Sequence, residues 1–288
     1  MSWSDVCLRA WRPFRLRSRR RAARAMSPQQ ARRMRGRRAT MNSEAVQRQQ
    51  ARRVLAMLDA SRHSRTALQA AVELAREHRA ELVALYVEDE NLLRSADFPF
   101  ACEVGARSGL ARPLTVAAMQ ATLSRQLQAV SQALESAVAG DGVTYSLQVT
   151  RGGVVAATLA RVTANDILVL GKAGFSAHGG GARLGSTCRT LLLQAPCTVL
   201  VYADDVPLRP GPLRVLSPPV PEALLQLPLC NSVETVQARS AGHLEHQLQR
   251  VRNGALLLRR AELRALASED PQLLARIPVP VIVLPDPV

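Results

Sequence analysis

From residue 53 onwards, short apolar runs alternate with segments in which apolar residues recur every three or four positions. The short runs, and a segment of strict apolar–polar alternation, are typical of buried and half-buried strands. They predict strands at 54–58, 82–87, 143–150, 167–170 and 198–202. The periodic segments predict helices at 68–75, 119–138, 154–163 and 186–194. This order predicts an α/β fold with a doubly wound parallel sheet.

The connection between the second predicted strand and the helix predicted at 119–138 is unusually long. Residues 88–113 contain Phe98, Pro99, Gly105, Gly109 and Pro113 and lack a clear period. A connection of this length inside a compact domain is usually functional or without fixed structure. Both expectations stay open from the sequence.

The end of the chain repeats its middle. Residues 191–204 (LLLQAPCTVLVYAD) align without gaps with 273–286 (LLARIPVPVIVLPD), and 166–171 align with 254–259. We therefore predict a first domain at 51–204, a Pro-rich linker at 205–212 and a reduced second copy at 213–288 that lacks the glycine-rich loop of the first. Pairing would hide the exposed edges of the two last strands, 198–202 and 281–284. We expect these strands to lie antiparallel at the centre of a pseudo-dimer, with the ladder beginning after Pro280, which has no N–H.

The charge of the chain is concentrated at its start. Residues 1–40 contain 13 arginines and one acidic residue, Asp5. They therefore supply most of the net charge of +15 that the chain of 288 residues carries. We expect residues 1–50 to be disordered or wrongly assigned. Three interpretations compete: an arm for nucleic acid or a membrane surface, a targeting peptide, and a start of translation further downstream, at Met26, Met34 or Met41.

Cysteine usage bears on the compartment. The five cysteines are scattered and form no C-x-x-C pair, which suits a reducing cytosol and argues against disulfides or a zinc site. No apolar stretch reaches the roughly 18 residues that a membrane helix needs. A cytoplasmic protein without a membrane partner is therefore expected, with nucleic acid as a partner only through the Arg-rich tail.

Glycine is concentrated in one segment, GKAGFSAHGGGARLGS, which holds six of the 16 glycines at residues 171–186. It lies between a predicted strand and a predicted helix, where backbone N–H groups and the positive end of the helix dipole can bind phosphate. The Walker pattern is absent because Asp166 and Ala173 occupy its Gly and Ser/Thr positions. The segment is a candidate phosphate cradle, and the alternative is a plain connecting loop.

Two stretches together resemble the universal stress protein family: VLAMLDASRHSRTALQAAVELAREHRAELVALYVED at 54–89, and DILVLGKAG with GSTCRTLLLQAPCTVLVY at 166–202. Its nucleotide-binding members carry G-x2-G-x9-G-(S/T) between the fourth strand and the last helix. Here Gly171, Gly174, Gly185 and Ser186 match, with ten residues in place of nine between Gly174 and Gly185. The resemblance covers residues 53–203 well and residues 212–288 weakly, as a degenerate second unit, and it implies a Rossmann-like fold.

The resemblance also implies site residues. Asp59 would bind the adenine or its vicinity, Val87 would contact the base through its backbone, and the matching glycines with Ser186 would hold ribose and phosphates. From charge alone, Lys172 and Arg183 could neutralise phosphate, and the alternative is that both are solvated. Asp59 could equally cap the turn or helix that follows it.

The expected function is binding of ATP or a related adenine nucleotide by the first domain, in a stress response, as a sensor or binding module. The alternative is an interaction scaffold of the same fold with an empty pocket; homo-oligomers are compatible with both. An enzyme is not expected, because the sequence has no nucleophile elbow and no S-G-G-x-D-S-like loop after its first strand. We assign no catalytic residue and no metal ligand.

Overall fold

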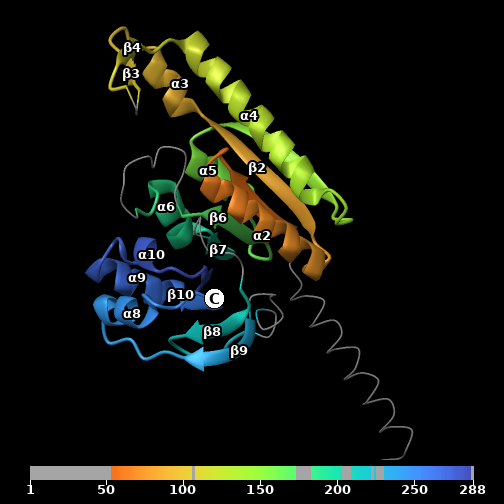
Figure 1. The fold of residues 1–288 in the computed structure, drawn as a ribbon, viewed down its shortest axis with the longest axis vertical. Helices are drawn as coiled ribbons and strands as arrows, with labels where there is room; N and C mark the ends of the chain where they lie inside the picture. The colour runs from red at the N-terminus through yellow and green to blue at the C-terminus, as the bar shows by residue number, and fades with distance from the viewer. Residues whose placement is uncertain are drawn as a thin grey trace, which may run out of the picture. The chain divides into compact units, whose positions relative to one another are not determined.

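In a computed structural model of the chain, residues 53–105, 108–172, 183–202, 209–221, 224 and 230–286 are described (Figure 1). Residues 48–288 belong to one compact unit. The Arg-rich tail lies outside the described residues, so its three interpretations stay open.

A single sheet of nine strands organises the described residues, in the order β5-β2-β1-β6-β7-β11-β10-β8-β9. A separate hairpin joins β3 to β4. The strands are β1 (Arg53–Leu58), β2 (Glu81–Asp89), β3 (Cys102–Val104), β4 (Ala111–Pro113), β5 (Tyr145–Gly152), β6 (Ile167–Gly171), β7 (Thr198–Tyr202), β8 (Gly211–Val215), β9 (Cys230–Thr235), β10 (Ala255–Arg259) and β11 (Val281–Leu284).

Neighbouring strands of the large sheet are parallel, with one exception at its middle. Strands β7 and β11 pair antiparallel, with Val201 opposite Val281, and the ladder begins directly after Pro280 as the sequence predicted. Strand β1 has β2 on one side and β6 on the other. The strand order therefore reverses between β1 and β6, where ligands bind in open parallel sheets.

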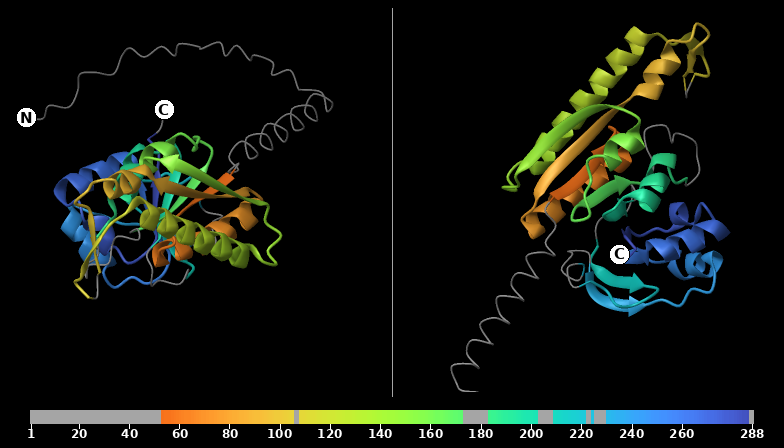
Figure 2. Two further views of the ribbon diagram at one scale, coloured as in Figure 1. Left: turned by 90° about the horizontal axis from the view of Figure 1, so that it is seen from above. Right: turned by 180° about the vertical axis from the view of Figure 1, so that it is seen from behind.

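Helices cover both faces of the sheet. Helices α2 and α4 lie over one face, and α5, α6, α8, α9 and α10 contribute to the core on the other (Figure 2). The helices are α2 (Arg62–His78), α3 (Glu90–Ala96), α4 (Val116–Val138), α5 (Val154–Leu159), α6 (Ser186–Gln194), α8 (Ala241–Leu248), α9 (Arg260–Glu269) and α10 (Leu273–Arg276).

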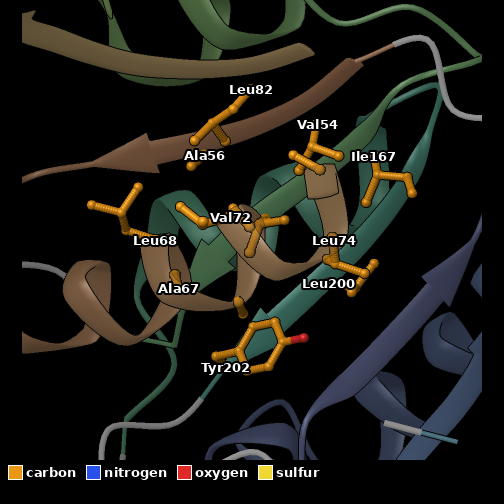
Figure 3. Close-up of a cluster of buried hydrophobic side chains, with 14 of the residues drawn as sticks. Val54, Ala56, Ala67, Leu68, Val72, Leu74, Leu82, Ile167, Leu200 and Tyr202 are labelled. Atoms are coloured by element: carbon orange, nitrogen blue, oxygen red, sulfur yellow. The ribbon is translucent and has the colours of Figure 1, made fainter. Parts of the chain in front are cut away.

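The central strands are apolar throughout because both their faces are buried. In β1, Val54 and Ala56 belong to the core on the α2 side, whereas Leu55 belongs to the core on the α6 side. Figure 3 shows Val54, Ala56 and Leu82 on the strands beside Leu68 and Val72 of α2. Removing this apolar surface from water is the main favourable term in folding.

The structure defines three segments more closely than the sequence does. The long insertion forms α3 and the β3–β4 hairpin, and its end leads into α4. Helix α5 ends at Leu159, four residues before the predicted end at 163, and the N–H of Thr163 donates instead to Asp166 Oδ2. Strand β9 spans Cys230–Thr235, and its pairing with β8 begins at Cys230.

The second half of the chain is shorter than the first. It contributes β8 to β11, and after β9 the chain enters α8 directly, without counterparts of α4 and β5. Of the predicted linker 205–212, residues 209–212 are described, and Gly211 and Pro212 already belong to β8. The division into two domains and their interpretation as a pseudo-dimer stay predictions.

Candidate functional site

A cleft of about 430 Å³ opens at the carboxyl ends of β1, β2 and β6, at the reversal of strand order. Its size lies within the range of small-molecule sites, about 300–1,000 Å³. The N-terminal turn of α6 and the first half of α4 complete its wall. The described lining residues are Met57, Leu58, Asp59, Ser64, Tyr86, Val87, Asp89, Leu92, Met119, Thr122, Leu123, Gln126, Val154, Gly171, Gly185, Ser186, Thr187 and Cys188.

Five of the eight candidate site residues line this cleft. They come from four different segments: Asp59 follows β1, Val87 lies in β2, Gly171 ends β6, and Gly185 and Ser186 begin α6. Only the parallel sheet brings these segments to one edge. Gly174 lies outside the described residues.

Asp59 forms part of the turn that leads from β1 into α2. Its Oδ1 accepts a hydrogen bond from the backbone N–H of Ser61 at 3.0 Å, and Ser61 in turn caps α2 by accepting from the N–H of Ser64. Ala60 between them has a φ of 61°, in the left-handed region that few non-glycine residues adopt. Asp59 thus has the turn-forming role that the sequence left open, and it also lines the cleft.

Strand β2 reaches further into the site than β1. Its last pair with β1 joins Tyr86 to Leu58, yet the strand continues to Asp89. The backbone around Val87 therefore borders the cleft beyond the end of its neighbour. Asp89 caps α3 by accepting from the N–H of Asn91 at 2.9 Å, and it brings a second carboxylate to the lining.

Helix α4 supplies a wall that the sequence did not assign to the site. Met119, Thr122, Leu123 and Gln126 line the cleft. Tyr86 ties this wall to the sheet, because its hydroxyl lies 3.3 Å from both the Leu123 carbonyl and Gln126 Oε1. In the sequence, the only sign of this wall was the helical spacing of apolar residues such as Met119 and Leu123. The same spacing is expected of a helix that merely packs on the sheet, so it did not point to the site.

Gly171 is required where β6 passes the start of α2. A Cβ at this position would lie 2.6 Å from the Cβ of His63 and 2.8 Å from its carbonyl carbon. Contacts of that length do not occur between real side-chain and backbone atoms, so only glycine fits without a shift of α2 or β6. The glycine thereby sets the spacing of two segments that border the cleft.

Replacing Gly171 with alanine is expected to lower the free energy of unfolding by about 1–3 kcal/mol, because the added methyl group overpacks the contact with His63. Urea denaturation measures this change. Gly242→Ala is the matched control, since a Cβ there meets nothing within 4 Å and alanine favours a helix. Equal stability of Gly171→Ala and the wild type would show that β6 and α2 can move apart to admit the methyl group without a loss of stability.

Helix α6 presents its N-terminal turn to the cleft. The N–H of Gly185 donates to the Lys172 carbonyl at 2.9 Å, which closes the base of the glycine-rich segment. Gly185 caps the helix without a side-chain hydrogen bond. The first N–H groups of a helix have no partner within it and attract negative groups. Ser186 and Thr187 lie at this end and line the cleft.

The placement of Lys172 argues against its predicted contact with phosphate. The side chain is buried, with 5% exposure, is absent from the described lining, and donates from Nζ to the Ile277 carbonyl in the second half. Burial lowers the pKa of Lys172 to about 8. The acceptor of the Lys172 ammonium group is thus a backbone carbonyl of the second half. Arg183 is exposed and is also absent from the described lining.

The charges of the described lining are negative. Asp59 and Asp89 contribute carboxylates, whereas the described lining includes no lysine or arginine. Burial raises the pKa of the Cys188 thiol to about 12, although nearby Lys172 opposes the shift. A thiol with so high a pKa is not a nucleophile at neutral pH. Donors to an anion at this site would therefore be backbone N–H groups and hydroxyls.

Within the described ranges, no three His, Cys, Asp or Glu side chains gather closely enough to hold a metal ion. In the same ranges, no helix combines the length and the apolar character that crossing a membrane requires.

Several solved structures match the chain. A universal stress protein from Archaeoglobus fulgidus has 15% identity and a TM-score of 0.52, with 82% of this chain and 99% of that chain covered. A universal stress protein from Lactobacillus plantarum has 20% identity and a TM-score of 0.38, covering 54% of this chain and 97% of its own. A universal stress protein in complex with cAMP has 17% identity and a TM-score of 0.34, with 54% and 98% covered.

Sequence comparison gives the same family. A search of curated protein sequences found no significant match, whereas the model of the universal stress protein family matches residues 50–203. That range is more than half of the chain and contains β1 to β7 together with the cleft. The chain belongs to the universal stress protein family.

Proposed function

We propose that the cleft binds ATP or a related adenine nucleotide, and that the protein acts in a stress response as a binding module or sensor. The observation that carries this proposal is the convergence of Asp59, Val87, Gly171, Gly185 and Ser186 on one cleft of about 430 Å³. We propose a binding role without catalysis, because the sequence contains no nucleophile elbow of the G-x-S-x-G kind.

The lining suggests how the ligand lies. Leu92, Met119 and Val154 offer apolar surface for the faces of a base, and the backbone beside Val87 offers hydrogen bonds to its edge. The carboxylates of Asp59 and Asp89 suit ribose hydroxyls, since carboxylates accept hydrogen bonds strongly. The phosphates would lie at the N-terminus of α6, where Ser186 and Thr187 begin the helix.

The negative lining favours a second candidate. With two carboxylates and no basic side chain among the described lining residues, the cleft has little charge to attract a polyphosphate. An interaction scaffold with an empty cleft is the alternative. Calorimetric titration of the purified protein with ATP, ADP, AMP and adenosine decides between them. If none of the four binds at millimolar concentration while the protein is folded, the scaffold is the better interpretation.

Ser186→Asp tests where the phosphates lie. The aspartate places a negative charge at the exposed start of α6, where it favours the helix but repels phosphate. We expect about tenfold weaker ATP binding, from roughly 1.4 kcal/mol of repulsion, and unchanged adenosine binding. Ser186→Asn is the matched control of similar size without the charge. Equal losses for ATP and adenosine in calorimetry would contradict this placement.

A further inference from the structure

Helix α6, whose N-terminal turn borders the cleft, is contacted at both ends by residues of the second half of the chain. Just before α6, the N–H of Leu184 donates to Gln272 Oε1 at 3.2 Å. Gln272 is the residue that precedes α10. The edge formed by Leu184, Gly185 and Ser186 is therefore attached to the second half at one defined point.

The other end of α6 is attached as well. Arg260, at the start of α9, is buried, and its guanidinium donates to the carbonyls of Leu192, Ala195 and Cys197. These carbonyls lie at and just beyond the last turn of α6, where helix carbonyls lack partners inside the helix. Arg260 thus satisfies the C-terminal end of the helix whose N-terminal end faces the cleft.

A third contact is the counterpart of the second. The aligned segments 166–171 and 254–259 are followed by Lys172 and Arg260. Lys172 donates to the carbonyl of Ile277, and Arg260 donates to the carbonyl of Ala195. Ile277 and Ala195 occupy equivalent positions in the alignment of 191–204 with 273–286. The two halves therefore exchange the same kind of contact across the β7–β11 pair.

We propose that the second half serves the cleft by positioning α6, with Gln272 as the positioning residue for the edge formed by Leu184, Gly185 and Ser186. This inference rests on the proposed function, since that edge is where phosphates would bind. Gln272 itself would not touch the ligand; by holding Leu184 it would position the start of α6, where Ser186 and Thr187 line the cleft. The second half has no glycine-rich loop of its own, and its contribution is to hold the start of α6, where the phosphates would bind.

Gln272→Ala tests the proposal in the full-length protein with two measurements. Proton exchange detected by NMR follows the Leu184 amide without ligand, and calorimetry follows ATP and adenosine. We expect faster exchange at Leu184 and about fivefold weaker ATP binding, the effect of one lost hydrogen bond, while adenosine binding is unchanged. Gln272→Glu should restore slow exchange at Leu184, because its carboxylate accepts the same bond.

Gln247→Ala is the matched control. Gln247 lies in α8 of the second half and donates to the Gln237 carbonyl at 3.1 Å, so its loss should change neither measurement. Unchanged exchange at Leu184 in Gln272→Ala would overturn the attachment. Equal losses for ATP and adenosine, or no loss of ATP affinity, would overturn the positioning role. If the wild type binds no nucleotide, the proposed function fails, and the exchange at Leu184 still decides whether Gln272 holds this edge.

Discussion

Replacing Arg260 with methionine is expected to lower the free energy of unfolding by about 3 kcal/mol. The side chain is 6% exposed and donates to three carbonyls from the end of α6. Methionine fills much of the volume but leaves those carbonyls buried without their donor, and each hydrogen bond to a charged group contributes roughly 1.5–3 kcal/mol. Urea denaturation of variant and wild type measures the difference.

The adjacent arginine is the control for this experiment. The side chain of Arg259 donates to the Pro219 carbonyl at an exposed position, so Arg259→Met should cost less than about 1 kcal/mol. Arg260→Lys should recover only part of the loss, because an ammonium group lacks the planar fork that reaches several carbonyls. If Arg260→Met and Arg259→Met are equally stable, Arg260 does not hold the two halves together.

Asp166→Asn is expected to lower the free energy of unfolding by about 3 kcal/mol. Asp166 precedes β6, at the end of the sheet opposite to the cleft. The carboxylate is fully buried and pairs with Arg53 at 2.7 Å. It also accepts from the N–H and hydroxyl of Thr163 at 2.7 and 2.8 Å. Breaking a buried ion pair costs about 3–5 kcal/mol, and the lower end applies because Arg53 is 31% exposed.

The loss should depend on pH. Burial by itself would raise the pKa of Asp166, but the hydrogen bonds from Arg53 and Thr163 outweigh it and hold the pKa below its usual value of 3.8. A carboxyl with a lowered pKa stabilises the fold above its unfolded pKa, and that stability declines below about pH 3.8. The difference between wild type and Asp166→Asn should therefore be constant near neutral pH and shrink in acid.

Asp141→Asn provides the matched control, because its pair with Arg76 at 3.3 Å lies at the surface. Exposed pairs contribute about 0–1 kcal/mol, so this variant should show a small loss. Comparable losses for Asp141→Asn and Asp166→Asn, or a difference that persists unchanged at acid pH, would argue against the ion pair as the cause.

The sequence alone determined the strands of the large sheet and the main helices of the first half. The apolar runs of β1, β2 and β6 and the period of α4 and α6 are local patterns, and burial on one or both faces produces them directly. The repeat also predicted the antiparallel pairing of β7 with β11, since both copies kept an apolar strand whose edge needs a partner. The hairpin β3–β4 could not be predicted, because its short, exposed strands carry no buried face.

For the site, the resemblance to the family implied Asp59, Gly171 and Ser186. Chain direction in a parallel sheet brings the strand ends and the helix start that carry these residues to one edge. The tertiary structure alone decided the direction of side chains whose partners are distant in sequence. Lys172 follows a glycine motif but donates to Ile277, 105 residues away, and Arg260 donates to Ala195, 65 residues away. A buried cation donates hydrogen bonds to the acceptors that the folded chain places around it, and these acceptors cannot be predicted from the neighbouring sequence.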